Sequence, residues 1–277
     1  MRRRQLLVAA PALLGIAMEL TARTEPVVAA MAFGSPGFAQ TWQRDEARVS
    51  GFWGDLSGAS ESLQEVNDDA PGGMRLVQYF NSGRMEQTVP GGPVTSGLLV
   101  RELITGTVSL GGRRTQSFGP ATLRLFGTEA DENPAYPIPT FADLAALPKF
   151  AEPGKTPLAY AMVRGHQWQP LSGYEGNAQN AASSGEFSGY VRDPSGTYQQ
   201  TILDHFQDFI NDKLAATIAE TIGYPITPIA VTQVAGDTYV CQAFERRLLA
   251  QVNTRTDAYL TIQGTGALYY NWRYVGR

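Results

Sequence analysis

The sequence is poor in the residues that most catalytic and metal sites need. Its 277 residues include one cysteine, Cys241, and two histidines, His166 and His205. A single cysteine excludes an internal disulfide and leaves a metal site without paired thiolates. Because the two histidines lie far apart in the sequence, a catalytic zinc site is not expected either.

Charge and short motifs are sparse as well. Charged residues make up 17% of the chain and the formal net charge is −4, so the chain lacks the basic character of nucleic-acid-binding proteins. No G-x-S-x-G nucleophile motif occurs, and "GTGALYY" (264–270) lacks the spacing and the following lysine of a phosphate-binding loop. We therefore expect no catalytic residue, no metal, no cofactor and no nucleic-acid partner.

Turn-forming and aromatic residues are plentiful. The chain has 29 Gly, 17 Pro, 12 Tyr and 12 Phe. This composition favours many turns and β structure filled with aromatic side chains over long helices.

The N-terminus resembles an export signal. Arg2, Arg3 and Arg4 precede an apolar stretch from Leu6 to Ala17, and "VVAA" (27–30) offers small residues at a cleavage position. The stretch of about 12 residues is short for a membrane span, which needs roughly 20. We predict a signal peptide over 1–30 and a secreted or cell-surface bacterial protein. An uncleaved membrane anchor remains the alternative, and the choice between general and twin-arginine export stays open.

Two stretches predict antiparallel β-meanders. In the first, the apolar runs 62–66 and 74–80 flank a turn, and "NSGR" (81–84) leads into "MEQTV". A helix over 97–106 follows, with Gly106 as its C-cap. In the second, "IAVTQV" and "TYVCQAF" flank "AGD", and "ERR" (245–247) leads into "LLAQV". A long helical pattern over 198–223, ending at Gly223, precedes it.

The pattern weakens between the meanders. "TLRLF" (122–126) predicts a strand, and Thr140, with Asp143 and Pro148 after it, predicts a short capped helix. The stretch 172–198 is rich in Gly, Ser and Asn, which is typical of a linker or a long surface loop.

The two meanders match each other in order. Gln78 aligns with Gln242 and Phe80 with Phe244, and "SGLLVREL" (96–103) aligns with "TGALYYNW" (265–272). We expect each Phe to point into the core and each Gln toward solvent or a loop backbone. On this interpretation "ERR" is scaffold, and Glu245 pairs with Arg247 across a solvated turn.

These motifs carry a resemblance. "GYPIT" (223–227), "CQAFERR" (241–247) and "GALYYNWRY" (266–274) resemble the repeated units of a set of exported bacterial proteins of uncharacterised function. "RLVQYFNSGRME" (75–86) and "VTSGLLVRELITG" (94–106) resemble the companion unit. The units are distantly similar to LGFP repeats of wall-associated proteins. The resemblance implies export and a repeated fold, and it transfers no catalytic residue.

We expect an α+β fold of two related units, each a helix plus an antiparallel β-meander, with a loop-rich insertion between them. The expected segments are 1–30 (signal), 31–127 (first unit), 128–200 (middle segment) and 201–277 (second unit).

Most candidate catalytic residues have a structural explanation. His205 fits a helix surface, and Cys241 fits a buried strand position with an inert thiol. A glycosidase needs two carboxylates, but any soluble chain offers several. The candidates here are Glu86, Glu102, Asp143, Glu175, Glu186 and Glu245.

Aromatic residues in a sparsely charged chain favour a binding surface. Exposed Trp and Tyr stack on sugar rings and supply polar tips. Trp168 and Tyr174 lie in polar, Gly-rich surroundings, and with Tyr190 and His166 they form the predicted ligand-binding set. We expect a non-enzymatic envelope or extracellular module whose partner is a polysaccharide or a surface protein, with peripheral attachment to the envelope. The alternative is a secreted hydrolase with its site in 107–200.

Overall fold

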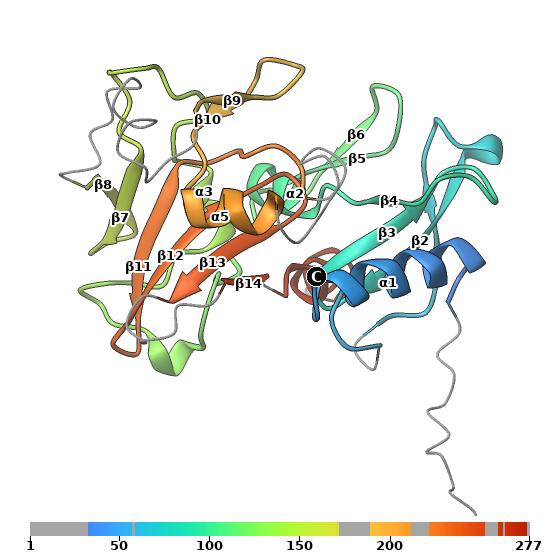
Figure 1. Cartoon of the computed structure of the whole chain (residues 1–277), viewed down its shortest axis with the longest axis horizontal. Coiled ribbons are helices and arrows are strands. Elements are labelled where there is room, and N and C mark those ends of the chain that lie inside the picture. Colours follow the sequence, from blue (N-terminus) through green and yellow to red (C-terminus); the bar gives the residue numbers. More distant parts are fainter. Residues whose placement is uncertain are drawn as a thin grey trace, which may run out of the picture. The chain divides into compact units, whose positions relative to one another are not determined.

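The structure is a computed structural model that describes residues 33–56, 59–171, 189–211, 222–252, 260–262 (backbone only) and 264–275. The chain divides into two compact units, Met1–Met31 and Ala32–Arg277, and all described residues lie in the second. This part is an α+β structure with several antiparallel sheets and few helices (Figure 1).

The first helix and the first sheet come from the N-terminal third. Helix α1 (Pro36–Arg48) begins at Ser35, whose hydroxyl accepts from the Phe38 N–H, with Pro36 in the first turn. The sheet is an antiparallel meander in the order β1-β2-β3-β4. Its strands are β1 (Leu63–Val66), β2 (Met74–Phe80), β3 (Gly83–Gln87) and β4 (Thr95–Ser96).

The second sheet has six strands in the order β14-β13-β12-β11-β7-β8. They are β7 (Ala159–Val163), β8 (Gln167–Pro170), β11 (Ile229–Val234), β12 (Asp237–Ala243), β13 (Leu248–Val252) and β14 (Leu260–Ile262). Ala235 and Gly236 both have positive φ, which suits the tight turn between β11 and β12. All pairs are antiparallel except β11 with β7, so the β7–β8 hairpin of the middle segment extends the meander β11–β14.

Smaller elements complete the described chain. Two short ladders join β5 with β6 and β9 with β10. The elements are β5 (Thr107–Ser109), β6 (Thr115–Ser117), β9 (Val191–Arg192), β10 (Gln199–Gln200), α2 (Leu99–Thr105), α3 (Phe141–Leu144), α5 (Asp204–Phe209), α7 (Thr265–Tyr270), the 3-10 turns η2 (Pro71–Gly73) and η3 (Glu129–Asp131), and the π-helical η5 (Asn271–Val275). Helix α3 has the predicted capping box between Thr140 and Asp143.

Two local predictions were wrong. The stretch 122–126 forms no strand and contributes only an isolated bridge from Arg124 to Thr140. The helix expected from 198 begins later, because Gln199 and Gln200 pair with β9 and the helix starts at Asp204. Its expected continuation over 212–221 lies outside the described residues, and Gly223 has the positive φ expected of a helix end.

The core is shared by residues from both meanders. One buried cluster contains Phe80 together with Phe244, and Phe38, Trp53 and Phe206 belong to it as well. A second contains Tyr79, Leu99 and Tyr269. Phe80 and Phe244 therefore point inward as predicted. Gln78 and Gln242 both donate to loop carbonyls, Gln78 to Ser60 at 3.0 Å and Gln242 to Thr201 at 2.7 Å.

Each meander's turn caps the helix that follows the other meander. Neither α2 nor α7 has a side-chain cap. Instead, the Arg101 N–H of α2 donates to the Glu245 carbonyl at 3.0 Å, and the Gly266 N–H of α7 donates to the Asn81 carbonyl at 2.9 Å. The free N–H groups of both helix starts thus find acceptors in hairpin turns.

The turn 245–247 differs from the prediction. Glu245 pairs with Arg101 of α2 at 3.2 Å, not with Arg247. Arg247 is 0% exposed, and its guanidinium lies 4.6 Å from the ring centre of Trp53 and 5.0 Å from that of Phe52. The long-range packing of α2 and of 52–53 decided these partners, which turn geometry alone does not reveal.

Candidate functional site

A buried network of charged and tyrosine side chains joins the first sheet to the C-terminal segment. Glu65 of β1 lies at its centre, 2.9 Å from Arg273 Nη1 and 3.3 Å from Arg75 Nη2. The other Glu65 oxygen accepts from the hydroxyls of Tyr79 at 2.5 Å and Tyr274 at 2.7 Å. Both carboxylate oxygens therefore have buried donors.

Arg84 of β3 connects the remaining carboxylates. Its Nε donates to Glu86 at 2.7 Å, and its Nη2 lies 3.6 Å from Glu102 of α2. Glu102 in turn accepts from the hydroxyl of Tyr269. With Glu65, Arg75 and Arg273, the network contains three carboxylates and three guanidinium groups, so its formal charges balance.

The two central carboxyls have opposite pKa shifts. Burial acts to raise the pKa of Glu65, but Arg84, Arg273 and the two tyrosine hydroxyls outweigh it and lower the pKa to about 2. At Glu102 burial dominates over the attraction of Arg84, and the pKa is raised. Burial likewise raises the pKa of Tyr79 and of Tyr269. The network is too enclosed to take a substrate, and its geometry fixes the C-terminal segment to the sheet.

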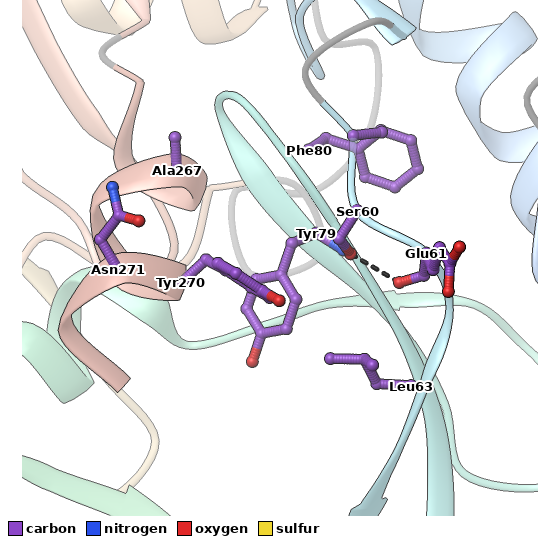
Figure 2. A pocket seen from close by; sticks show the side chains of 9 residues that line it. Ser60, Glu61, Leu63, Tyr79, Phe80, Ala267, Tyr270 and Asn271 are labelled. Carbon is purple, nitrogen blue, oxygen red and sulfur yellow. Dashed lines mark hydrogen bonds between the residues drawn. The ribbon is translucent and has the colours of Figure 1, made fainter. Parts of the chain in front are cut away.

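A pocket of about 460 Å³ lies directly beside this network. One wall is the segment 59–63 with the end of β2, and the opposite wall is the start of the C-terminal segment. The lining residues are Ala59, Ser60, Glu61, Leu63, Tyr79, Phe80, Ala267, Tyr270 and Asn271. Figure 2 shows Tyr270 and Asn271 on one side, Ser60 and Glu61 on the other, and Tyr79 between them.

The pocket has a rigid floor and a polar rim. Tyr79 is 2% exposed, and its ring meets Tyr270 edge-on at 5.3 Å between centroids. The Ser60 N–H donates to the Tyr79 carbonyl at 2.8 Å, so the rim segment runs beside the strand that holds the floor. Tyr270 is half-buried, while Glu61 and Asn271 are exposed. The pocket therefore offers the half-exposed ring of Tyr270, over a floor formed by the buried Tyr79 and Phe80, together with the amide of Asn271 and the carboxylate of Glu61 at its rim.

The predicted ligand residues His166 and Trp168 lie together elsewhere, on the β7–β8 hairpin. His166 occupies the turn with φ of 56°, and its Nδ1 lies 3.0 Å from Asp143 Oδ2. The indole N–H of Trp168 donates to the Asp143 carbonyl at 2.7 Å, and the half-buried ring packs against the core. Asp143 of α3 thus holds both residues, and the hydrogen-bonding group of Trp168 is already occupied.

The other two predicted ligand residues are not brought to this hairpin by any described contact. Tyr174 lies outside the described residues. Tyr190 is half-buried against the cluster of Phe38 and Phe80, not against the cluster on which Trp168 packs. The predicted set of His166, Trp168, Tyr174 and Tyr190 remains a prediction.

The remaining candidates have clear positions. Glu86 and Glu102 belong to the buried network, Asp143 caps α3, and Glu245 pairs with Arg101. Glu175 and Glu186 lie outside the described residues. His205 is exposed on α5, as expected. Cys241 is buried, and burial raises the pKa of its thiol to about 12, which agrees with the inert thiol predicted.

The residues of the pocket and the network were missed because their sequence context looks structural. Tyr79, Tyr270 and Asn271 lie within the repeat-like segments. Only the "YYNWRY" run (269–274) gave a signal, a dense group of aromatic side chains next to the buried Arg273. Glu65, which accepts a hydrogen bond from Arg273, lies 208 residues earlier, and no local pattern links the two residues.

Comparison with known proteins adds no relative: no family model, curated protein or solved structure matches the chain. Among the described helices, none combines the length and hydropathy needed to cross a membrane. The described His, Cys, Asp and Glu side chains form no group of three that could hold a metal ion.

Proposed function

We propose that this chain is an exported, non-enzymatic binding module of the cell envelope or extracellular space, and that its ligand is a saccharide held in the pocket between Tyr270 and Ser60. The observation that carries the proposal is the lining of the pocket, where an aromatic ring stands beside hydroxyl, amide and carboxylate groups. Sugar rings pair an apolar face with hydroxyls around their edge, which such a lining complements.

The size and the support of the pocket agree with this function. Ligand pockets commonly measure about 300–1,000 Å³. The Tyr270 wall belongs to α7, which is held by the Asn81 carbonyl at its start and by the buried network at Tyr269 and Arg273. A wall fixed before binding lowers the entropy cost of association.

Retention of the purified mature protein on insoluble peptidoglycan, chitin and cellulose tests the proposal. Tyr270→Ala should lower retention on the bound polymer about tenfold, since an aromatic contact contributes about 0.5–1.5 kcal/mol beyond its buried area. Tyr136→Ala is the matched control, because Tyr136 is exposed and outside the pocket. Full retention by Tyr270→Ala, with loss in Trp168→Ala, would place the ligand on the β7–β8 hairpin instead.

A secreted hydrolase remains the second candidate because of one observation in the region 107–200, the pairing of His166 with Asp143 at 3.0 Å. The other ring nitrogen of His166 lies 4.0 Å from Glu132. Under this alternative, His166→Ala would reduce product release from a polysaccharide or peptide by about 10² to 10⁴. Under the binding proposal the variant retains full polymer binding, and wild-type protein releases no product.

We further propose that the fold consists of two related units, as the sequence resemblance implies. Three facts support it: both meanders run in the same strand order, Gln78 lies opposite Met85 as Gln242 lies opposite Leu249, and each turn caps the other unit's helix.

Export belongs to the same proposal. Its support is the arginine-led apolar stretch before residue 30. A pulse-chase of the native gene product should show a precursor shortened by roughly 25 to 40 residues, a range typical of removed signals. An unprocessed cytoplasmic product would exclude an extracellular role.

A further inference from the structure

Four tyrosines, Tyr79, Tyr269, Tyr270 and Tyr274, cluster at the pocket, and arginine guanidinium groups lie over three of their rings. Tyr79 and Tyr269 have the Arg84 guanidinium at 5.6 and 5.0 Å from their ring centres, and Tyr274 has that of Arg273 at 5.2 Å. Tyr270 contacts Tyr79 and Tyr274 through its ring. Among the described residues, no guanidinium or ammonium lies over Tyr270, the one ring of the four that is both half-exposed and part of the pocket lining.

The pocket also has an unpaired negative charge. Glu61 is exposed at the rim, across the pocket from Tyr270 and Asn271 (Figure 2). Within the described part of the chain, its carboxylate has no hydrogen bond and no ion pair. No Lys, Arg or His occurs among the described lining residues. The neighbouring buried network is balanced in charge, so it does not offset Glu61.

From these contacts we infer that the pocket selects a saccharide bearing a free amino group, such as glucosamine, over its N-acetylated or neutral counterpart. An ammonium group is attracted to the electron-rich face of a tyrosine and to a carboxylate, and acetylation removes its charge. Tyr270 supplies the face and Glu61 the carboxylate, while the Asn271 amide remains for the hydroxyls. The Ser60 hydroxyl is already bonded to the Glu61 carbonyl and the Tyr79 N–H, so it shapes the wall. This inference rests on the proposed saccharide function and narrows its ligand class.

Calorimetric titration with the glucosamine trimer and the N-acetylglucosamine trimer, at moderate salt, tests the inference. The wild-type protein should bind the amine trimer about tenfold more tightly, as expected when a cation–π contact and a rim ion pair act together. Glu61→Gln should reduce this preference to about twofold or less, chiefly by weakening the binding of the amine trimer. Glu129→Gln is the matched control, because Glu129 is exposed and outside the pocket, and it should keep the full preference.

The outcomes separate the two proposals. Equal binding of both trimers, weakened for both by Tyr270→Ala, would overturn the amine preference and leave the saccharide function standing. A preference that Glu61→Gln and Glu129→Gln reduce equally would assign it to the overall negative charge and overturn the role of Glu61. Binding of neither trimer, together with Tyr270→Ala retaining all polymers as wild type does, would overturn both. Binding of a lysine tripeptide but of no saccharide would also overturn both.

Discussion

The guanidinium of Arg247 lies against the backbone of Gly83. A β-carbon built on Gly83 would stand 2.4 Å from both Nη1 and Nη2 of Arg247. The two residues hold matching places, because Gly83 closes the turn after Phe80 and Arg247 closes the turn after Phe244. The two turns therefore meet at a point with room for only one side chain.

This contact predicts a steric cost at Gly83. Gly83→Ala should lower the free energy of unfolding by about 1–3 kcal/mol, as overpacking of a core does. Chemical denaturation measures the effect. In the double variant with Arg247→Ala the penalty should largely vanish, since the clashing side chain is gone. Additive losses in the double variant would show that the two residues do not compete for space.

Arg84 and Arg247, both fully buried, should respond differently to removal of their charge. Arg84 is 1% exposed and pairs with buried carboxylates, so Arg84→Met should destabilise the protein by about 3–5 kcal/mol because it leaves those charges uncompensated. Arg247 faces aromatic rings and forms no ion pair with a described carboxylate, and Asp45 attracts its charge only from a longer distance. Its Nη1 donates to the Arg246 carbonyl at 3.1 Å, while its Nε and Nη2 have no hydrogen-bond partner among the described residues.

Arg247→Met should therefore change stability by less than about 1 kcal/mol in the same denaturation experiment, since an apolar side chain suits this site. Equal losses in the two methionine variants would contradict this difference.

Stability should fall in acid through Glu65. Its folded-state pKa of about 2 lies below the ordinary value of 4.5, so between these values the unfolded chain binds more protons and the stabilisation is lost as pH falls. The melting temperature of Glu65→Gln should depend less on pH in this window than that of the wild type. If the variant does not fold, an NMR titration of the wild-type Glu65 carboxyl gives the value directly, and a midpoint at or above 4.5 would refute the prediction.

Phe80 and Phe244 should contribute equally to the core. They are 1% and 0% exposed and belong to one cluster. Phe80→Ala and Phe244→Ala should each cost about 3–5 kcal/mol in thermal or chemical unfolding. If one substitution left the stability unchanged while the other unfolded the protein, the proposed equivalence of the two units would be contradicted.

Cys241 should not react with thiol reagents in the native protein. Burial raises the pKa of its thiol from 9.0 to about 12, and the side chain is 1% exposed. A colorimetric thiol assay at pH near 8 should detect the thiol only after denaturant is added. Cys241→Ser provides the blank, and rapid labelling of native protein would show that β12 opens.

Hairpins and capped helices were predictable because their signals are local. The turn at 235–236 places two positive-φ residues in succession, and the Thr140–Asp143 capping box spans a single turn of helix. The strand predicted at 122–126 failed for the opposite reason. Its residues have strand propensity, but the segment forms a single bridge, Arg124 with Thr140, through the hydrogen bonds of Leu123 and Leu125 to residues 139–141, and no ladder extends from it.

The sequence by itself determined the α+β class, the two meanders with the inward Phe80 and Phe244, and the inert Cys241, because side-chain alternation and turn chemistry act over a few residues. Only the tertiary structure decided the partners of the charged residues and the place of the pocket. Glu65 and Arg273 form an ion pair although 208 residues separate them in the sequence. Ser60 and Tyr270 are likewise far apart in the sequence, and the fold places them on facing walls of one pocket. The energy of a buried charge depends on which groups the fold brings within a few ångströms, and a local pattern contains no record of those groups.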